Sequence, residues 1–94
     1  MTSITRKIGA NRGKPRLWLE GKVLVSAGLD HGNRWNLVPV EGGLDLVRSD
    51  DGKRKIAGKP GRPIIDLAGA SVPWPTGTVV TLTFKQGKGV IHVR

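Results

Sequence analysis

The residues best suited to chemistry in this chain are two lysines in glycine- and proline-rich segments. Gly13-Lys14-Pro15 and Gly58-Lys59-Pro60 each set an ammonium group among backbone N–H groups that can hold a phosphate. The proline after each lysine departs from the phosphate-loop pattern of nucleotide hydrolases, which has serine or threonine there. The two segments therefore indicate binding of a phosphate-rich partner rather than nucleotide hydrolysis.

The net charge points to the same kind of partner. Sixteen Lys and Arg residues against seven Asp and Glu residues give a net charge of +9, which favours DNA, RNA or an acidic protein surface. Ten of the sixteen cations lie in two stretches that contain no acidic residue. These ten are the candidate nucleic-acid-binding residues: Arg6, Lys7, Arg12, Lys14, Arg16, Lys53, Arg54, Lys55, Lys59 and Arg62.

Residue types that support catalysis or metal binding are sparse. The chain has no cysteine, and neither His31 nor His92 has a ligand partner at helical or hairpin spacing. The serines lie in no recognisable nucleophile motif. We therefore expect no enzyme activity, no catalytic or metal-binding residues and no cofactor.

The two basic segments introduce two similar sequence units. Each segment runs into a short apolar strand, at residues 16–20 and 64–67, and each strand is followed by a predicted hairpin, at residues 34–48 and 79–94. We interpret the chain as a diverged tandem duplication, whereas the alternative is chance similarity between segments rich in glycine and valine. In this alignment His92 occupies the position of Leu46.

The chain is short enough to form one domain, residues 1–94. Within it we expect four parts: a basic N-terminal arm at 1–12, repeat unit one at 13–48, repeat unit two at 49–94, and in unit two a basic loop at 53–62. The alternation of apolar and polar residues predicts a mostly β fold. No run of about 18 apolar residues is present, so a membrane partner is not expected.

At most one short helix is expected, in residues 21–28 of unit one. Pro73 and Pro75 exclude a helix from the corresponding part of unit two. The tryptophans Trp18, Trp35 and Trp74 are expected in the core or at its edge, and the alternative for them is a base-stacking role.

The order of these segments resembles the AbrB/MazE-type swapped-hairpin family and its SymE-like branch. The resemblance is carried by Arg16-Leu-Trp-Leu-Glu-Gly21, by Ala27-Gly-Leu-Asp-His-Gly32 and by the turn at Gly42-Gly43. It implies that two units interleave into one small β-barrel, here as tandem units of a single chain. It also implies DNA contacts at Lys14, Arg16, Lys59 and Arg62.

A second resemblance is narrower. Residues 8–22 are similar to a domain at the start of some phage and plasmid cytosine-5 DNA methyltransferases. The methyltransferase motifs themselves do not fit in 94 residues, so we expect no methylation activity.

Together these features predict a small basic protein that binds duplex DNA through two symmetric basic loops. Strands 16–20 and 64–67 are expected to run antiparallel near a pseudo-twofold axis, with their preceding loops forming one patch. The expected role is a phage- or plasmid-type transcriptional regulator in the cytoplasm, either a monomer with internal symmetry or a homodimer. The alternatives are an inhibitor that docks on an acidic protein partner and a SymE-like RNA-binding toxin.

Overall fold

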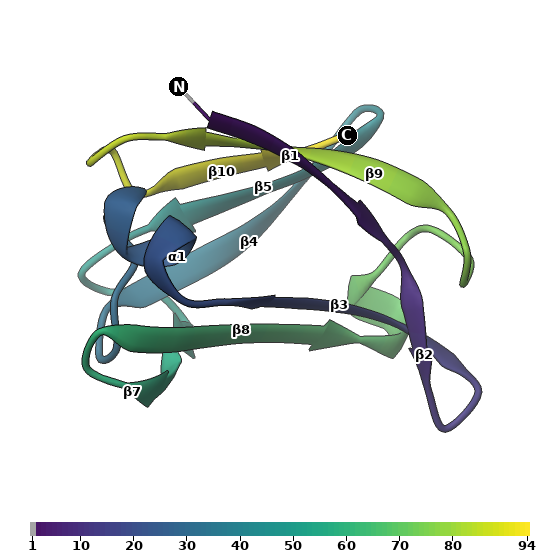
Figure 1. Cartoon of the computed structure of the whole chain (residues 1–94), viewed down its shortest axis with the longest axis horizontal. Coiled ribbons are helices and arrows are strands. Elements are labelled where there is room, and N and C mark those ends of the chain that lie inside the picture. Colours follow the sequence, from purple (N-terminus) through teal and green to yellow (C-terminus); the bar gives the residue numbers. More distant parts are fainter. Residues whose placement is uncertain (1) are drawn as a thin grey trace.

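The computed structural model describes residues 2–94, which form two antiparallel β-sheets facing each other across a core (Figure 1). The six-stranded sheet has the order β1-β9-β10-β5-β4-β6, and the four-stranded sheet has the order β2-β3-β8-β7. The strands of the six-stranded sheet are β1 (Thr2–Lys7), β4 (Arg34–Val40), β5 (Gly43–Arg48), β6 (Arg54–Lys55), β9 (Val79–Lys85) and β10 (Val90–Val93). Those of the four-stranded sheet are β2 (Gly9–Asn11), β3 (Lys14–Glu20), β7 (Ala57–Lys59) and β8 (Arg62–Ala68).

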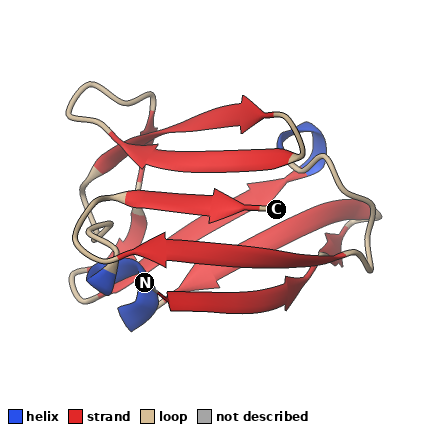
Figure 2. Ribbon diagram, turned by 90° about the horizontal axis from the view of Figure 1, so that it is seen from above, coloured by secondary structure: helices blue, strands red, loops and turns tan. Residues whose placement is uncertain are grey.

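The prediction of a mostly β fold with one short helix is confirmed. The α-helix α1 (Lys22–Ser26) has five residues, and unit two has in its place the 3₁₀ turn η1 (Gly69–Ser71). Within the described residues, 2–94, the sheets do not close into the expected barrel, because β1, β6, β2 and β7 are edge strands that each pair on one side only. The two helical turns lie at opposite ends of the molecule (Figure 2).

A buried isoleucine marks each point where the chain passes from the six-stranded to the four-stranded sheet. Ile8 separates β1 from β2, Ile56 separates β6 from β7, and each is 1% exposed. The Ile8 N–H donates to the Thr78 carbonyl at 2.8 Å, and the Ile56 N–H donates to the Asn33 carbonyl at 2.9 Å. Each half of the chain is therefore bonded to the start of the other half's hairpin.

These crossings change two of the predicted boundaries. Residues 1–12, expected as an arm, supply β1 and β2 from residue 2 onward, because Ile8 is buried in the core. Residues 53–62, expected as a basic loop, contain β6 and β7 for the same reason at Ile56. Both segments are thus integral parts of the sheets.

Matching strands of the two halves pair at the centre of each sheet. In the four-stranded sheet β3 pairs with β8, with Trp18 opposite Asp66, and in the six-stranded sheet β5 pairs with β10, with Asp45 opposite His92. Moving outward from these central pairs, β2 corresponds to β7, β4 to β9, and β6 to β1. The strand pairings therefore relate the two halves by an approximate twofold axis.

The core lies between the inner faces of the sheets. Its residues from the four-stranded sheet include Leu17 and Leu67, which are opposite each other, and α1 adds Leu24, which is fully buried. Trp35 is buried and Trp74 packs against the core, as expected. Trp18 is 38% exposed, so the prediction is wrong for it: it alternates with buried leucines on β3 and faces solvent.

Two neighbouring glycines at the β4–β5 turn provide a test of this packing. A Cβ atom at Gly43 would overlap the carbonyl oxygen of Val93 on β10, whereas one at Gly42 would meet nothing within 4 Å. We expect Gly43→Ala to lower the free energy of unfolding by about 3 kcal/mol, because the backbone of a paired strand cannot move aside without disturbing its pairing.

Gly42→Ala is the control, since it adds only the strain of a positive φ of 78°. That strain costs about 1 kcal/mol. Urea denaturation of the two variants measures both values. Equal losses would contradict the close approach of β5 and β10.

Candidate nucleic-acid interface

The outer face of the four-stranded sheet collects four of the predicted contacts. Leu17 and Leu19 of β3 point into the core, so the residues that alternate with them face solvent, and β8 follows the same pattern. Lys59 on β7 is the cross-strand partner of Arg62 and shares its face. This surface, called the basic face below, carries Lys14, Arg16, Lys59 and Arg62.

The cations of the basic face lie at two opposite ends of it. Ile64 is opposite Glu20, and Arg62 lies two residues beyond Ile64 on β8, so its level on the sheet is eight residues along from Lys14. The levels of Lys14 and Arg62 on the sheet are therefore separated by roughly 26 Å along the strands, at 3.3 Å per residue. Figure 1 shows the β2–β3 hairpin at one end of the sheet and the β7–β8 hairpin at the other. The two loops present cations on one face, but the expected single patch is wrong, because antiparallel strands begin at opposite ends.

The hairpin register also corrects which basic residues correspond to each other. Lys14 pairs with Asn11 next to one turn, and Arg62 pairs with Lys59 next to the other. Lys14 is therefore the counterpart of Arg62, and Arg16 is the counterpart of Ile64. Aligning the two Gly-Lys-Pro motifs therefore places unit two three residues away from its structural register. The motif in unit two that matches Gly13-Lys14-Pro15 in the structure is Gly61-Arg62-Pro63.

Arg16 is held by other side chains of the basic face. Its Nε lies 2.9 Å from Asp66 Oδ1 and its Nη2 lies 3.0 Å from Asp66 Oδ2, which makes a bidentate ion pair. Its Cζ atom lies 4.5 Å from the centre of the Trp18 ring, in cation–π geometry. The Arg16 guanidinium is thus fixed at the middle of the face, while its predicted role is a direct DNA contact.

The remaining predicted residues divide into a turn residue and residues near the edges of the six-stranded sheet. Arg12 lies in the β2–β3 turn with a positive φ of 54°, beside the basic face. Arg54 covers the core: its Cζ atom is 5.5 Å from the Trp35 ring centre, and its Nη2 donates to Ser71 Oγ at 3.1 Å. The others lie on β1 or on and beside β6, away from the basic face: Arg6, Lys7, Lys53 and Lys55.

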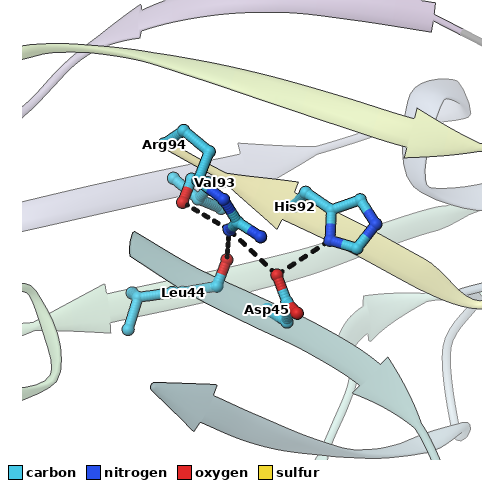
Figure 3. Close-up of polar contacts among 5 residues, drawn as sticks. All are labelled: Leu44, Asp45, His92, Val93 and Arg94. Atoms are coloured by element: carbon cyan, nitrogen blue, oxygen red, sulfur yellow. Dashed lines mark hydrogen bonds and ion pairs between the residues drawn. The ribbon is translucent and has the colours of Figure 1, made fainter. Parts of the chain in front are cut away.

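A second polar cluster joins β5 to β10 (Figure 3). It lies on the outer face of the six-stranded sheet, because Leu44 and Leu46 on either side of Asp45 are buried. His92 Nδ1 and Arg94 Nη1 lie 2.8 Å and 2.9 Å from the same oxygen, Asp45 Oδ1. Arg94 Nη1 also donates to the carbonyl oxygens of Leu44 and Val93. His92 thus pairs across the twofold with Asp45, so its predicted equivalence with Leu46 is wrong by one residue. The strand alternation, with Leu44 and Leu46 buried, was the signal that could have revealed this.

Within the described residues, the contacts of this cluster are ion pairs and hydrogen bonds to backbone carbonyls. No hydrogen bond joins His92 to a hydroxyl group in residues 2–94. Over the same residues, no group of three His, Asp or Glu side chains is placed to hold a metal ion. The arrangement is that of an ion-pair cluster joining β5 to β10.

The helices of the described chain, residues 2–94, are all too short or too polar to cross a membrane. Comparison with known proteins found no matching protein family, no matching curated protein and no matching solved structure. The resemblance to the swapped-hairpin family therefore depends on the sequence motifs given above and stays a prediction.

The Asp45 cluster predicts an acid-sensitive part of the stability. Partial burial alone would raise the pKa of Asp45, but the hydrogen bonds and charges of His92 and Arg94 outweigh it and hold that pKa below its usual value. A lowered folded-state pKa stabilises the fold above the unfolded pKa of about 3.9 and loses that effect as the pH falls through the folded value. We expect Asp45→Asn to flatten the fall in unfolding free energy between about pH 5 and about pH 3.

Urea denaturation across this pH range measures the difference. Asp50→Asn is the matched control, because it removes an exposed carboxylate that forms no ion pair within residues 2–94. Parallel pH profiles for wild type and Asp45→Asn would show that the cluster does not stabilise the sheet.

Proposed function

We propose that this chain is a small DNA-binding protein that holds duplex DNA against the basic face. The contacts are cations in and next to the turns of two hairpins: Arg12 and Lys14 at one end, and Lys59 and Arg62 at the other. The observation that carries the proposal is that two hairpins related by an approximate twofold axis both present cations on one face. None of these four side chains forms an ion pair within residues 2–94, so all four are available to phosphates.

The shape of this surface suits a duplex. A two-stranded β-ribbon fits the major groove of B-DNA, which is about 12 Å wide. The separation of roughly 26 Å between the two strand starts is less than one helical turn of about 34 Å. Both hairpins lie on one face of the protein, so they would approach the duplex from one side, one on each side of the twofold axis.

The approximate twofold axis of the basic face also suggests the kind of DNA site. Twofold-related contacts favour a target that repeats in inverted orientation, as the operators of many regulators do. We therefore infer a role as a transcriptional regulator of the phage or plasmid type, acting in the cytoplasm. Phosphate contacts supply most of the affinity in such a complex and fix the register of the protein on the duplex.

Charge reversal tests the proposal at structurally equivalent positions. Lys14→Glu and Arg62→Glu should each weaken binding to a 20-base-pair duplex by about tenfold, because each replaces a phosphate contact with repulsion. Fluorescence anisotropy at fixed salt measures the affinities. The dependence of log K on log salt should have a slope of about −3.6 for four phosphate contacts and fall in magnitude by about one in each variant.

Lys88→Glu is the control, since Lys88 is an exposed lysine in the β9–β10 turn of the other sheet. It makes the same change in net charge and should alter the affinity by less than about threefold. If Lys88→Glu weakens binding as much as the other two reversals, net charge rather than the basic face determines binding. If none of the three reversals has an effect, the partner is not a nucleic acid bound at this face.

A further inference from the structure

An exposed tryptophan lies at the centre of the basic face. Trp18 is 38% exposed, whereas Trp35 is 3% exposed in the core. Its cross-strand partner is Asp66, which forms the bidentate ion pair with Arg16, and Arg16 in turn lies over the Trp18 ring. Three neighbouring side chains therefore form one unit, called the Trp18 platform below: the Arg16 guanidinium lies over the indole ring, and the Asp66 carboxylate holds the edge of the guanidinium.

The duplex contacts described above do not use this platform. They involve phosphates at the two ends of the face, and the edges of an indole ring carry one hydrogen-bond donor and no charge. An exposed ring and a guanidinium plane are instead the surfaces on which unpaired bases stack. The bases of an intact duplex are already stacked on each other, so only an unpaired base can use such a surface.

The platform is already ordered for stacking in the free protein. The two hydrogen bonds from Arg16 to Asp66 fix the plane of the guanidinium, so stacking requires little further ordering of that side chain. The platform lies about midway between the cations at the two ends, roughly 13 Å from the levels of Lys14 and Arg62 on the sheet. A strand of nucleic acid crossing the face would meet cations, then the platform, then cations again.

We propose that the Trp18 platform is a stacking site for an unpaired base, and that the basic face thereby binds single-stranded nucleic acid. The 26 Å between its ends corresponds to about eight nucleotides at the 3.4 Å spacing of a stacked strand. This length falls within the range of about 4 to 16 nucleotides bound by one OB fold, which is another small β fold. A hollow of about 300 Å³ at the Arg62 end of the face, lined by Glu20, Lys59, Arg62 and Ile64 together with Gly58, gives room for a nucleotide next to these cations.

The proposal shares the cations of the basic face with the proposed duplex binding, and it differs in requiring the platform. The experiment compares three fluorescent probes by anisotropy: 12-nucleotide oligo(dT), 12-nucleotide oligo(U) and a 20-base-pair duplex. Trp18→Leu should weaken binding of the single strands by at least tenfold, since a stacked base is lost. Arg16→Lys should also weaken it, because lysine keeps the charge and loses the plane fixed by Asp66.

The matched control for Arg16→Lys is Arg34→Lys, which makes the same change on the outer face of the six-stranded sheet. Circular dichroism confirms the fold of each variant, and Arg16→Lys keeps the test valid if Trp18→Leu does not fold. Duplex affinity should change by less than about threefold in Trp18→Leu, because the duplex contacts are phosphates. Comparing the affinities for oligo(dT) and oligo(U) shows whether the site prefers unpaired bases of DNA or of RNA.

Three results would overturn the proposal. The first is a wild-type protein that binds neither single strand. The second is single-strand binding that Trp18→Leu leaves unchanged while Lys14→Glu weakens it, because charge alone then accounts for the affinity. The third is an equal loss for the duplex and the single strands in Trp18→Leu. If single strands bind through Trp18 and the duplex does not bind at all, the stacking site stands and the proposed duplex function falls.

Discussion

The antiparallel pairing of β3 with β8 is the interaction on which the rest of this structure depends. It sets Leu17 opposite Leu67 and Leu19 opposite Ile65, and all four are buried against the six-stranded sheet. Because side chains alternate along a strand, the same register turns the intervening residues outward. A slip of one residue would bury the cations and expose the leucines. The register that buries the core is therefore the same register that exposes the basic face.

The two halves of the chain complete each other's sheets. β1 from the first half pairs with β9 of the second, and β6 from the second half pairs with β4 of the first. The crossings at Ile8 and Ile56 make this exchange possible, since each carries the chain from one sheet to the other through a single buried residue. Neither half forms a closed core alone, which ties the twofold arrangement of the hairpins to the stability of the whole domain.

The sequence predicted the hairpins, the mostly β fold and the short helix, because these follow from local alternation and from glycine and proline. It did not predict the register between the repeats, because unit two contains two similar motifs, one beginning at Gly58 and one at Gly61. Both glycines have a positive φ and both precede a cation, so either could have been the counterpart of Gly13. Trp18 was expected in the core or at its edge because aromatic rings supply much of the buried area of a small domain, although its alternation with Leu17 puts it outside. The pairing of Arg16 with Asp66 joins residues that are 50 positions apart, and no local pattern reveals it.

The central claim is that nucleic acid binds at the outer face of the four-stranded sheet. The most direct test is the change in backbone amide chemical shifts of the ¹⁵N-labelled protein when a 20-base-pair duplex is added. The account predicts that the largest changes lie in the β2–β3 and β7–β8 hairpins, including Lys14 and Arg62, with little change around His92. Changes concentrated on β5, β9 and β10, with β3 and β8 unaffected, would contradict it.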